Sequence, residues 1–117
     1  EILRCLVGSE MCIRDSPYIT HYDMWRELCY FVKYCGVTPA FALHSATLGN
    51  AALAGIAGET GSIQPGKCAD MIVCAADPLA DLTALRTLDM VIKSGYRVEH
   101  PQVKKMDNVE RELDKFL

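Results

Sequence analysis

Histidine and cysteine are the residues of this chain that could bind a metal or act as nucleophiles. The three histidines stand at positions 21, 44 and 100, and none of them forms a His-x-His pair. Cys29 and Cys35 lie on one predicted helix, and Cys68 and Cys74 flank a predicted strand. No Cys-x-x-Cys pair occurs, so a compact zinc site is not expected. Scattered cysteines of this kind are typical of small buried hydrophobes in a reducing compartment, which favours the cytoplasm.

The composition indicates a single globular domain. The chain has 117 residues, half of them hydrophobic, and a formal net charge of −3. A core is therefore expected and disorder is not. Acidic and basic residues are interspersed, without the basic stripe of a nucleic-acid-binding protein. No apolar run approaches the ~20 residues of a membrane span and no secretory signal peptide is recognised, so neither nucleic acid nor a membrane is an expected partner.

An amphipathic helix is predicted to follow Thr20. Thr20 and Asp23 have the spacing of a capping box, and Gly36 is the expected stop. Asp23, Arg26 and Glu27 are interpreted as charges of the helix start and of a solvated face. Apolar residues repeat at helical spacing and predict one buried face, made by Trp25, Leu28, Cys29, Val32 and Cys35.

Further helices and then short strands are predicted downstream. Thr38 and Pro39 begin a second helix, as a hydroxyl cap and a first helical residue. The remaining elements are a short helix over 47–54, a type II turn over 64–67, a strand over 69–74, a loop with one helical turn over 78–89, a hairpin of strands over 90–93 and 96–98, and a terminal helix from Asp107. The predicted order, with helices first and short strands after them, lacks the alternation of strands and helices that a complete parallel-sheet enzyme shows.

Two stretches carry a resemblance to a known family. They read "TPAFALHSATLGNAALAG" and "GSIQPGKCADMIVCAADPLADLTALRTLDMVIKSG". The matching motifs, in order, are Thr38-Pro39, Ala46-Thr47, Gly61-Ser62-Ile63, Pro65-Gly66-Lys67, Ala69-Asp70 and Val91-Ile92-Lys93-Ser94-Gly95. Together they resemble the C-terminal end of the amidohydrolase superfamily, in its imidazolonepropionase-like and prolidase-like branch, over residues 16–100.

The resemblance implies an α/β fragment. It would contain the last helix of a (β/α)8 metal-dependent hydrolase barrel, short helices, and then the C-terminal strands of the accompanying small β-sandwich. Residues 17–58 would belong to the barrel domain, residues 59–100 to the β-sandwich domain and residues 101–117 to a terminal amphipathic helix. Asp70 would hydrogen-bond nearby backbone, and Lys67 would lie in solvent at its turn. The terminal helix would dock on its own barrel or on a second subunit, which leaves a homo-oligomer open.

The resemblance also implies a metal-dependent amidohydrolase that hydrolyses amide-type C–N bonds, non-peptide or dipeptide-like, in a small-molecule substrate. Such enzymes hold one or two divalent metals, here expected to be zinc, and the metal activates a water molecule. The last metal ligand, a catalytic Asp, would fall at Asp15, although Ile13 and Arg14 replace the family's Gly-Thr. His21 would line the mouth of the substrate pocket; the alternative is a solvated histidine near a helix start.

The length of the chain limits what it is expected to do alone. A complete barrel takes ~250 residues, so this fragment is expected to be inactive and to bind no metal by itself. The alternative is a non-catalytic structural or interaction domain. Trp25, with Tyr18 and Tyr22, is expected to pack the first helix against the barrel, or else to contact substrate. Without the barrel strands that this helix would cover, the chain is expected to aggregate or stay molten.

The first residues resemble something other than a protein family. Residues 5–16, "CLVGSEMCIRDS", resemble the in-frame translation of a transposase adapter used in sequencing libraries, whose end reads Met-Cys-Ile-Arg-Asp. Residues 1–16 are therefore predicted to be adapter-derived. Cys5 and Cys12 would then have no role, and Asp15 could share that origin. The alternative is a genuine strand over residues 2–7.

Overall fold

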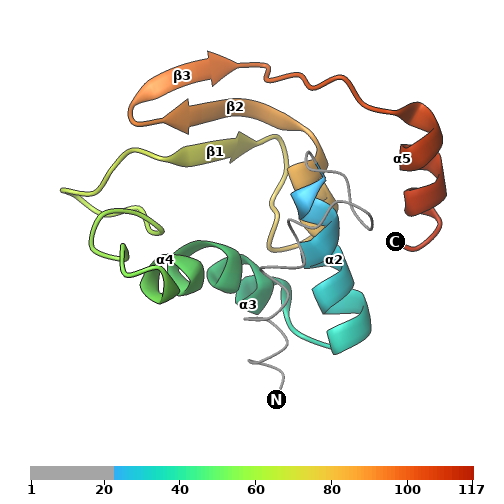
Figure 1. Cartoon of the computed structure of the whole chain (residues 1–117), viewed down its shortest axis with the longest axis horizontal. Coiled ribbons are helices and arrows are strands. Elements are labelled where there is room, and N and C mark those ends of the chain that lie inside the picture. Colours follow the sequence, from blue (N-terminus) through green and yellow to red (C-terminus); the bar gives the residue numbers. More distant parts are fainter. Residues whose placement is uncertain (1–22) are drawn as a thin grey trace.

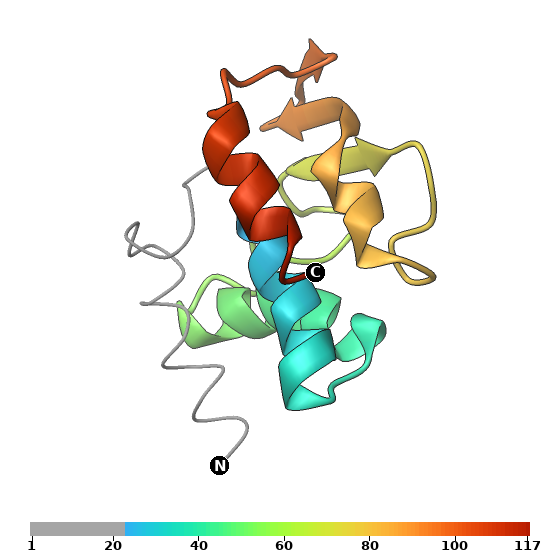
Figure 2. The same ribbon diagram turned by 90° about the vertical axis from the view of Figure 1, so that its right-hand side faces the viewer.

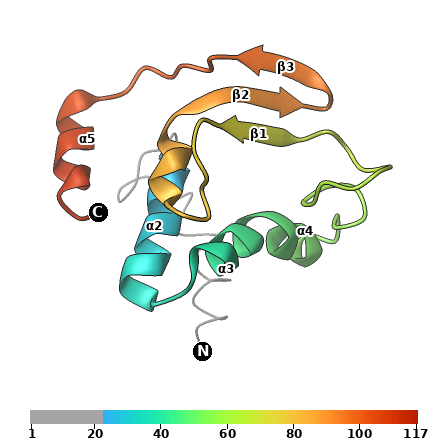
Figure 3. The same ribbon diagram turned by 180° about the vertical axis from the view of Figure 1, so that it is seen from behind.

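The computed structural model describes residues 23–117; three α-helices precede its strands and one follows them, as predicted (Figure 1). The elements in chain order are α2 (Met24–Cys35), α3 (Pro39–His44), the π-helical turn η1 (Ser45–Gly49), α4 (Asn50–Leu53), β1 (Met71–Cys74), the 3-10 helix η2 (Leu82–Arg86), β2 (Leu88–Lys93), β3 (Tyr96–Glu99) and α5 (Asp107–Asp114). The sheet faces α3 and α4 across the molecule, and α2 and α5 lie at one end (Figure 1 and Figure 3). Within the described range no helix is long and apolar enough to cross a membrane.

Helix α2 begins and ends close to the predicted residues. Asp23 is its N-cap, and Gly36 ends it in the left-handed conformation with φ of 68°, which glycine adopts without strain. The Asp23 carboxylate accepts hydrogen bonds from the side chains of Trp25 and Arg26, and the predicted capping box stays a prediction. The other predicted member, Thr20, lies outside the described residues.

The second helix begins as predicted and continues further. The Thr38 hydroxyl accepts a hydrogen bond from the Phe41 backbone N–H at 3.1 Å, and Pro39 is the first helical residue. The backbone stays helical from Pro39 to Leu53, passing through η1 rather than starting a separate helix at Thr47. The Thr47 hydroxyl donates back to the Leu43 carbonyl at 2.7 Å, a bond that accompanies local helix distortion.

The three strands form an antiparallel sheet in the order β1-β2-β3. The turn between β2 and β3 has φ of 51° at Ser94 and 83° at Gly95. Two consecutive residues with positive φ make a type I′ turn, whose twist suits a two-residue hairpin. The predicted hairpin is therefore confirmed, with Lys93 paired to Tyr96 next to the turn. The predicted type II turn is also confirmed, with Gly66 at φ of 90° and a Lys67 N–H to Gln64 carbonyl bond of 3.3 Å.

Two charged residues near the sheet have different outcomes. Asp70 accepts hydrogen bonds from the Ser94 backbone N–H at 2.9 Å, from Lys93 at 3.0 Å and from Thr60 at 3.3 Å. Its predicted structural role is confirmed, because it ties the chain before β1 to the hairpin turn. The prediction that Lys67 lies in solvent is wrong: its ammonium donates to the Ala57 carbonyl and to the Ser62 hydroxyl, and the residue is half-buried.

The core is small and lies at the α2 end of the molecule. Its buried apolar residues come from α2, α3 and η2: Trp25, Leu28, Ala42, Leu82 and Leu85. Trp25 packs its helix against residues of this chain, and its expected packing against the barrel stays a prediction. Cys35 is exposed, so the predicted apolar face of α2 ends before it.

Candidate functional site

The residues predicted to perform chemistry are not among the described ones. Asp15 and His21 lie outside residues 23–117, as do Cys5 and Cys12. His44 is exposed on α3, as expected for a solvated histidine. In the described part of the chain, no three His, Cys, Asp or Glu side chains come together in a way that could hold a metal ion. Residues 23–117 therefore do not fit the divalent metal that the resemblance implies.

The four described cysteines divide into two kinds. Cys29 and Cys74 are half-buried and pack against the core, and burial raises the pKa of both thiols. A raised pKa leaves little thiolate at neutral pH, so these two behave as the predicted small hydrophobes. The same prediction is wrong for Cys35 and Cys68, which are exposed. All four are free thiols.

The strongest concentration of charge is a buried cluster that joins α2 to α5, 84 residues further along the chain. We call it the Arg26 clamp; it consists of Asp23, Arg26, Glu110 and Asp114. The guanidinium of Arg26 contacts Asp23 at 3.1 Å through Nε, Glu110 at 2.8 Å through Nη2 and Asp114 at 2.8 Å through Nη1. Arg26 and Asp23 are 0% exposed and Glu110 is 6% exposed. Three nitrogens of one arginine thus form ion pairs with carboxylates at the N-cap of α2 and on α5, although Nη1 makes no hydrogen bond within the described residues.

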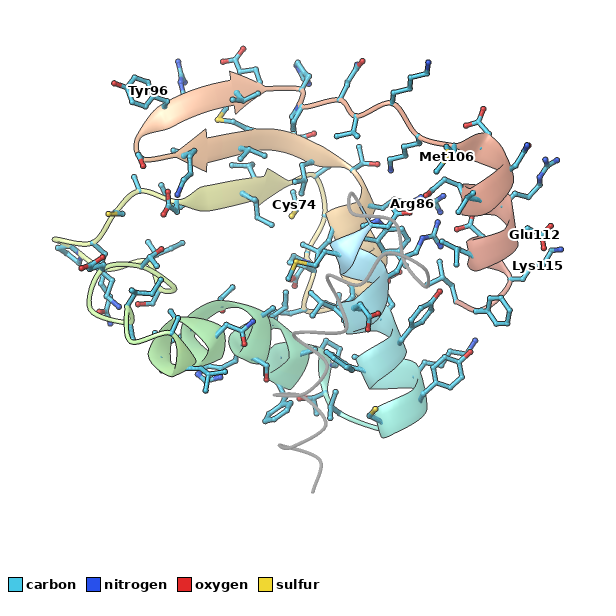
Figure 4. All side chains as sticks on the ribbon, in the orientation of Figure 1. Cys74, Arg86, Tyr96, Met106, Glu112 and Lys115 are labelled. Carbon is cyan, nitrogen blue, oxygen red and sulfur yellow. The ribbon has the colours of Figure 1, made fainter. Side chains whose placement is uncertain are left out.

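Trp25 lies beside the clamp and completes it. Its ring has the guanidinium of Arg26 at 4.6 Å from the centroid and that of Arg86 at 5.3 Å. Its indole N–H donates to Asp23 at 3.1 Å. Arg86 also extends from η2 toward α5, as Figure 4 shows, and reaches Asp114 at 3.1 Å. Cation–π contacts of this type strengthen where water is excluded.

The clamp has three acidic groups and one basic group, and the neighbouring Arg86 and Lys105 offset the excess negative charge. Burial works against the charge of Arg26, but its contacts with Glu110, Asp114 and Asp23 outweigh it and raise the pKa of the guanidinium. Burial raises the pKa of Glu110, and the neighbouring Asp23 carboxyl raises it further, against the effect of Arg26. The hydrogen bond from Arg86 lowers the pKa of Asp114. Lys105, 4.0 Å from Asp23, supplies a further positive charge at the edge.

Helix α5 is also fixed at its other end. Lys33 and Tyr34, on the last turns of α2, each donate a hydrogen bond of 2.9 Å to the carbonyl of Phe116. The two helices therefore run side by side in the same direction (Figure 2). Of the two docking surfaces expected for the terminal helix, the structure has α5 on the helix of its own chain.

Sequence reasoning missed the clamp because it interpreted Arg26 as a solvated charge. The structure contradicts this: Arg26 is among the largest fully buried side chains of the described residues. Asp23 and Arg26, three positions apart at a helix start, are a local signal that could have suggested a pair. Glu110 and Asp114 have helical spacing too, but no local pattern connects them with a residue so far away.

A second feature is an apolar groove between the helices and the sheet, which we call the sheet groove. Its volume is about 680 Å³, and its lining includes Ala51, Ile63, Ile72, Val91 and Ile92. Asp70 and Lys93, which are paired with each other at 3.0 Å, lie at its border. At Gly61, which also lines it, a Cβ would lie 2.6 Å from the Cβ of Ala51. The groove can accept apolar side chains, and several of its polar groups already have partners: Lys93 and Thr60 donate to Asp70, Lys67 donates to Ser62, and Thr47 donates to the Leu43 carbonyl.

Comparison with known proteins gives one family and several solved structures, two of which are the following. The amidohydrolase family matches residues 5–98. The structure of a putative prolidase from Bifidobacterium longum superposes with a TM-score of 0.80 and 43% identity, covering 84% of this chain and 24% of that one. The structure of a Xaa-Pro dipeptidase with bound methionine in the active site gives a TM-score of 0.62 and 38% identity, covering 65% and 18%. No curated protein matches. The chain thus spans about a quarter or less of the length of these structures.

Proposed function

Because the chain belongs to the amidohydrolase family, we propose that it is the C-terminal part of a larger hydrolase that cleaves an amide-type C–N bond in a dipeptide-like substrate. The observation that carries this proposal is the 43% identity to the putative prolidase over 84% of the chain. The second structural relative bears the name of a Xaa-Pro dipeptidase. Both names support a dipeptide that ends in proline as the substrate to test first.

In the proposed enzyme, residues 23–117 are scaffold rather than reacting groups. Helix α2 is the helix that follows the last barrel strand, and strands β1–β3 are the C-terminal share of the small β-sandwich. The sheet groove would receive apolar side chains from the rest of that enzyme, which accounts for the exposure of Ile63 and Ile72 along it. The 43% identity across this region supports that arrangement.

A divalent metal, zinc in this proposal, would supply an activated water molecule in the complete enzyme. Residues 23–117 contain no cluster that could hold it, so we assign them no step of the reaction. Asp15 is proposed as the last metal ligand and His21 as a residue of the pocket mouth. The 117-residue chain alone is accordingly proposed to be inactive.

The test is to extend the reading frame upstream in the source DNA and express the longer protein. We expect a His-x-His motif upstream and hydrolysis of Xaa-Pro dipeptides that a chelator abolishes and Zn²⁺ restores. The matched control is the 117-residue chain, which should release no amino acid under the same conditions. A longer frame without such a motif, whose folded product hydrolyses no amide, would contradict the proposal and favour a non-catalytic interaction domain.

The same DNA decides the origin of residues 1–16, which we propose to be adapter-derived. The family match starts at residue 5 and so includes part of this stretch. Codons for residues 5–15 that differ from those of the adapter would overturn the proposal. Codons identical to the adapter would remove Asp15 from the list of native metal ligands and leave His21 unaffected.

A further inference from the structure

We propose that Arg26 is a positioning residue for hydrolysis: gripped by Asp23 at the N-cap of α2 and by Glu110 and Asp114 of α5, it fixes the first turn of α2 at the active-site face of the enzyme. The inference rests on the proposed function, in which α2 is the helix that follows the last barrel strand. In this proposal α5 contributes to catalysis by holding Arg26 in place, although α5 holds no reacting group.

The location of the clamp follows from the barrel architecture. In (β/α)8 enzymes the active site lies at the carboxyl ends of the strands. A helix that follows a strand begins at that same face, because the chain turns there from strand to helix. The first turn of α2, which contains Asp23 and Arg26, would therefore lie at the active-site face. The segment proposed to carry the last metal ligand enters α2 at this turn.

The geometry of the clamp specifies an orientation and not only a contact. Asp23 uses one oxygen for the Trp25 indole at 3.1 Å and the other for Arg26 Nε at 3.1 Å. The two terminal nitrogens of Arg26 are 2.8 Å from Glu110 and 2.8 Å from Asp114. A planar guanidinium held at three edges cannot rotate without breaking an ion pair. The first turn of α2 is thereby fixed with respect to α5.

Stability alone does not account for such a cluster. Replacing a buried ion pair by apolar side chains of similar size is often neutral or stabilising, whereas removing one partner is strongly destabilising. The clamp residues are also balanced by neighbours: Asp23 has Lys105 at 4.0 Å, and Asp114 has Arg86 at 3.1 Å. Removing Arg26 and Glu110 together takes away one positive and one negative charge, and it leaves Asp23 with Lys105 and the Trp25 indole and Asp114 with Arg86. The double variant therefore separates positioning from stability better than either single removal.

The experiment uses the complete enzyme and the double variant Arg26→Met/Glu110→Leu. We expect its unfolding temperature and bound metal to stay at the wild-type level while kcat falls by about ten- to a hundredfold, because small misplacements of an active-site segment cost this much. KM should change by no more than about threefold, since no substrate contact is removed. The single variant Arg26→Lys, which keeps a positive charge, should recover part of the lost kcat.

Two further variants keep the test decisive if the double variant folds poorly. Glu110→Gln preserves side-chain shape and should lower kcat and alter its pH profile without changing the fold. Lys115→Met, on the same helix, breaks an exposed ion pair with Glu112 of 2.7 Å and should leave kcat unchanged.

Each contrary result has its own meaning. A folded double variant with wild-type kcat would overturn the positioning role and leave the proposed function intact. A loss of kcat that is recovered at low temperature together with the folded fraction would also overturn it, because the role would then be structural. A folded, zinc-loaded wild-type enzyme that hydrolyses no amide would overturn the proposed function and this inference with it.

Discussion

The Arg26 clamp and the sheet groove differ in which side chains are exposed to solvent: the clamp buries charged ones and the groove exposes apolar ones. In the clamp, Arg26 and Asp23 are 0% exposed, while along the groove Ile63 is 85% exposed and Ile72 is 51% exposed. Burying charge is unfavourable unless it is paired, and burying apolar surface is favourable. The clamp is therefore a contact whose charged partners all come from this chain, although Arg26 Nη1 and Glu110 Oε1 have no hydrogen-bond partner within the described residues. The groove is an incomplete one, for which it supplies a single side.

The largest expected change in the free energy of unfolding comes from breaking the ion pairs of the Arg26 clamp. Arg26→Met in the 117-residue chain removes the cation shared by three carboxylates, at 2.8 to 3.1 Å. Removing one partner of a buried ion pair leaves uncompensated charge, so we expect a loss of about 3–5 kcal/mol in the free energy of unfolding. Urea denaturation followed by circular dichroism measures it, and a cooperative transition of the wild-type chain would contradict the expectation that the chain stays molten. Hydrogen exchange should report α5 as released.

A matched variant on the same helix tests whether burial is the cause. Lys115→Met breaks an ion pair whose side chains are 62% and 67% exposed, and exposed pairs contribute at most about 1 kcal/mol. If Arg26→Met and Lys115→Met lowered the free energy of unfolding equally, burial would not be the cause of the clamp's contribution to stability.

The second effect concerns the apolar core beneath the clamp. Leu85 of η2 is 9% exposed and belongs to the core with Trp25, whereas Leu53 at the groove end is 58% exposed. Leu85→Ala should destabilise the chain by about 2–3 kcal/mol, because it leaves a cavity. Leu53→Ala should change stability by no more than about 0.5 kcal/mol. The free energy of unfolding of the two variants measures the contrast directly, and a larger loss for Leu53→Ala would reverse it.

The elements and contacts around the sheet groove were predicted better from the sequence than those around the Arg26 clamp. Local patterns determine the elements around the groove: Thr38 and Pro39 start a helix, and Ser94-Gly95 forms the predicted hairpin turn. Asp70 was also predicted correctly, because its partners Lys93 and Ser94 belong to a motif of the family resemblance. Even here the prediction that Lys67 lies in solvent was wrong, because a lysine at an exposed turn can still donate a hydrogen bond to a neighbouring carbonyl.

The candidate site could not be predicted because its contacts are not local. Arg26 has the periodicity of a polar helix face, and Glu110 and Asp114 of the docked α5 pair with it there. Pairing of residues 84 positions apart depends on the tertiary path of the whole chain, which no spacing rule contains. The catalytic expectations at Asp15 and His21 stay predictions, because both lie outside the described residues.

The third effect is a pH dependence that separates two carboxyls of the clamp. The pKa of Glu110 is raised above its usual 4.5 by burial and by Asp23, so its contribution is full below that pH and is lost as pH rises through the folded-state value. The pKa of Asp114 is lowered below its usual 3.8, chiefly by Arg86. Its contribution is present above that pH and is lost as pH falls through the folded-state value.

The clamp should therefore be most stable near pH 4, between these two transitions. Unfolding curves collected across the acidic range measure this, with Glu110→Gln as the comparison. The variant should lack the decline on the neutral side and keep the decline on the acid side. A wild-type chain whose stability rises steadily from pH 4 to 7, with Glu110→Gln following the same curve, would contradict the assignment.

The smallest effect on stability is expected in the groove, where it reveals most about what is missing. Ile72, on β1, is 51% exposed and lines the groove. Ile72→Lys should change the free energy of unfolding by no more than about 0.5 kcal/mol, because the side chain is already in contact with water. It should nevertheless reduce aggregation and the binding of a hydrophobic dye, since exposed apolar patches drive association. In the complete enzyme the same substitution should be strongly destabilising if the groove is filled there. If Ile72→Lys left the free energy of unfolding unchanged in both proteins, the groove would be open in the complete enzyme as well. The groove would then not be one side of a missing contact, and it could not be contrasted with the clamp on that ground.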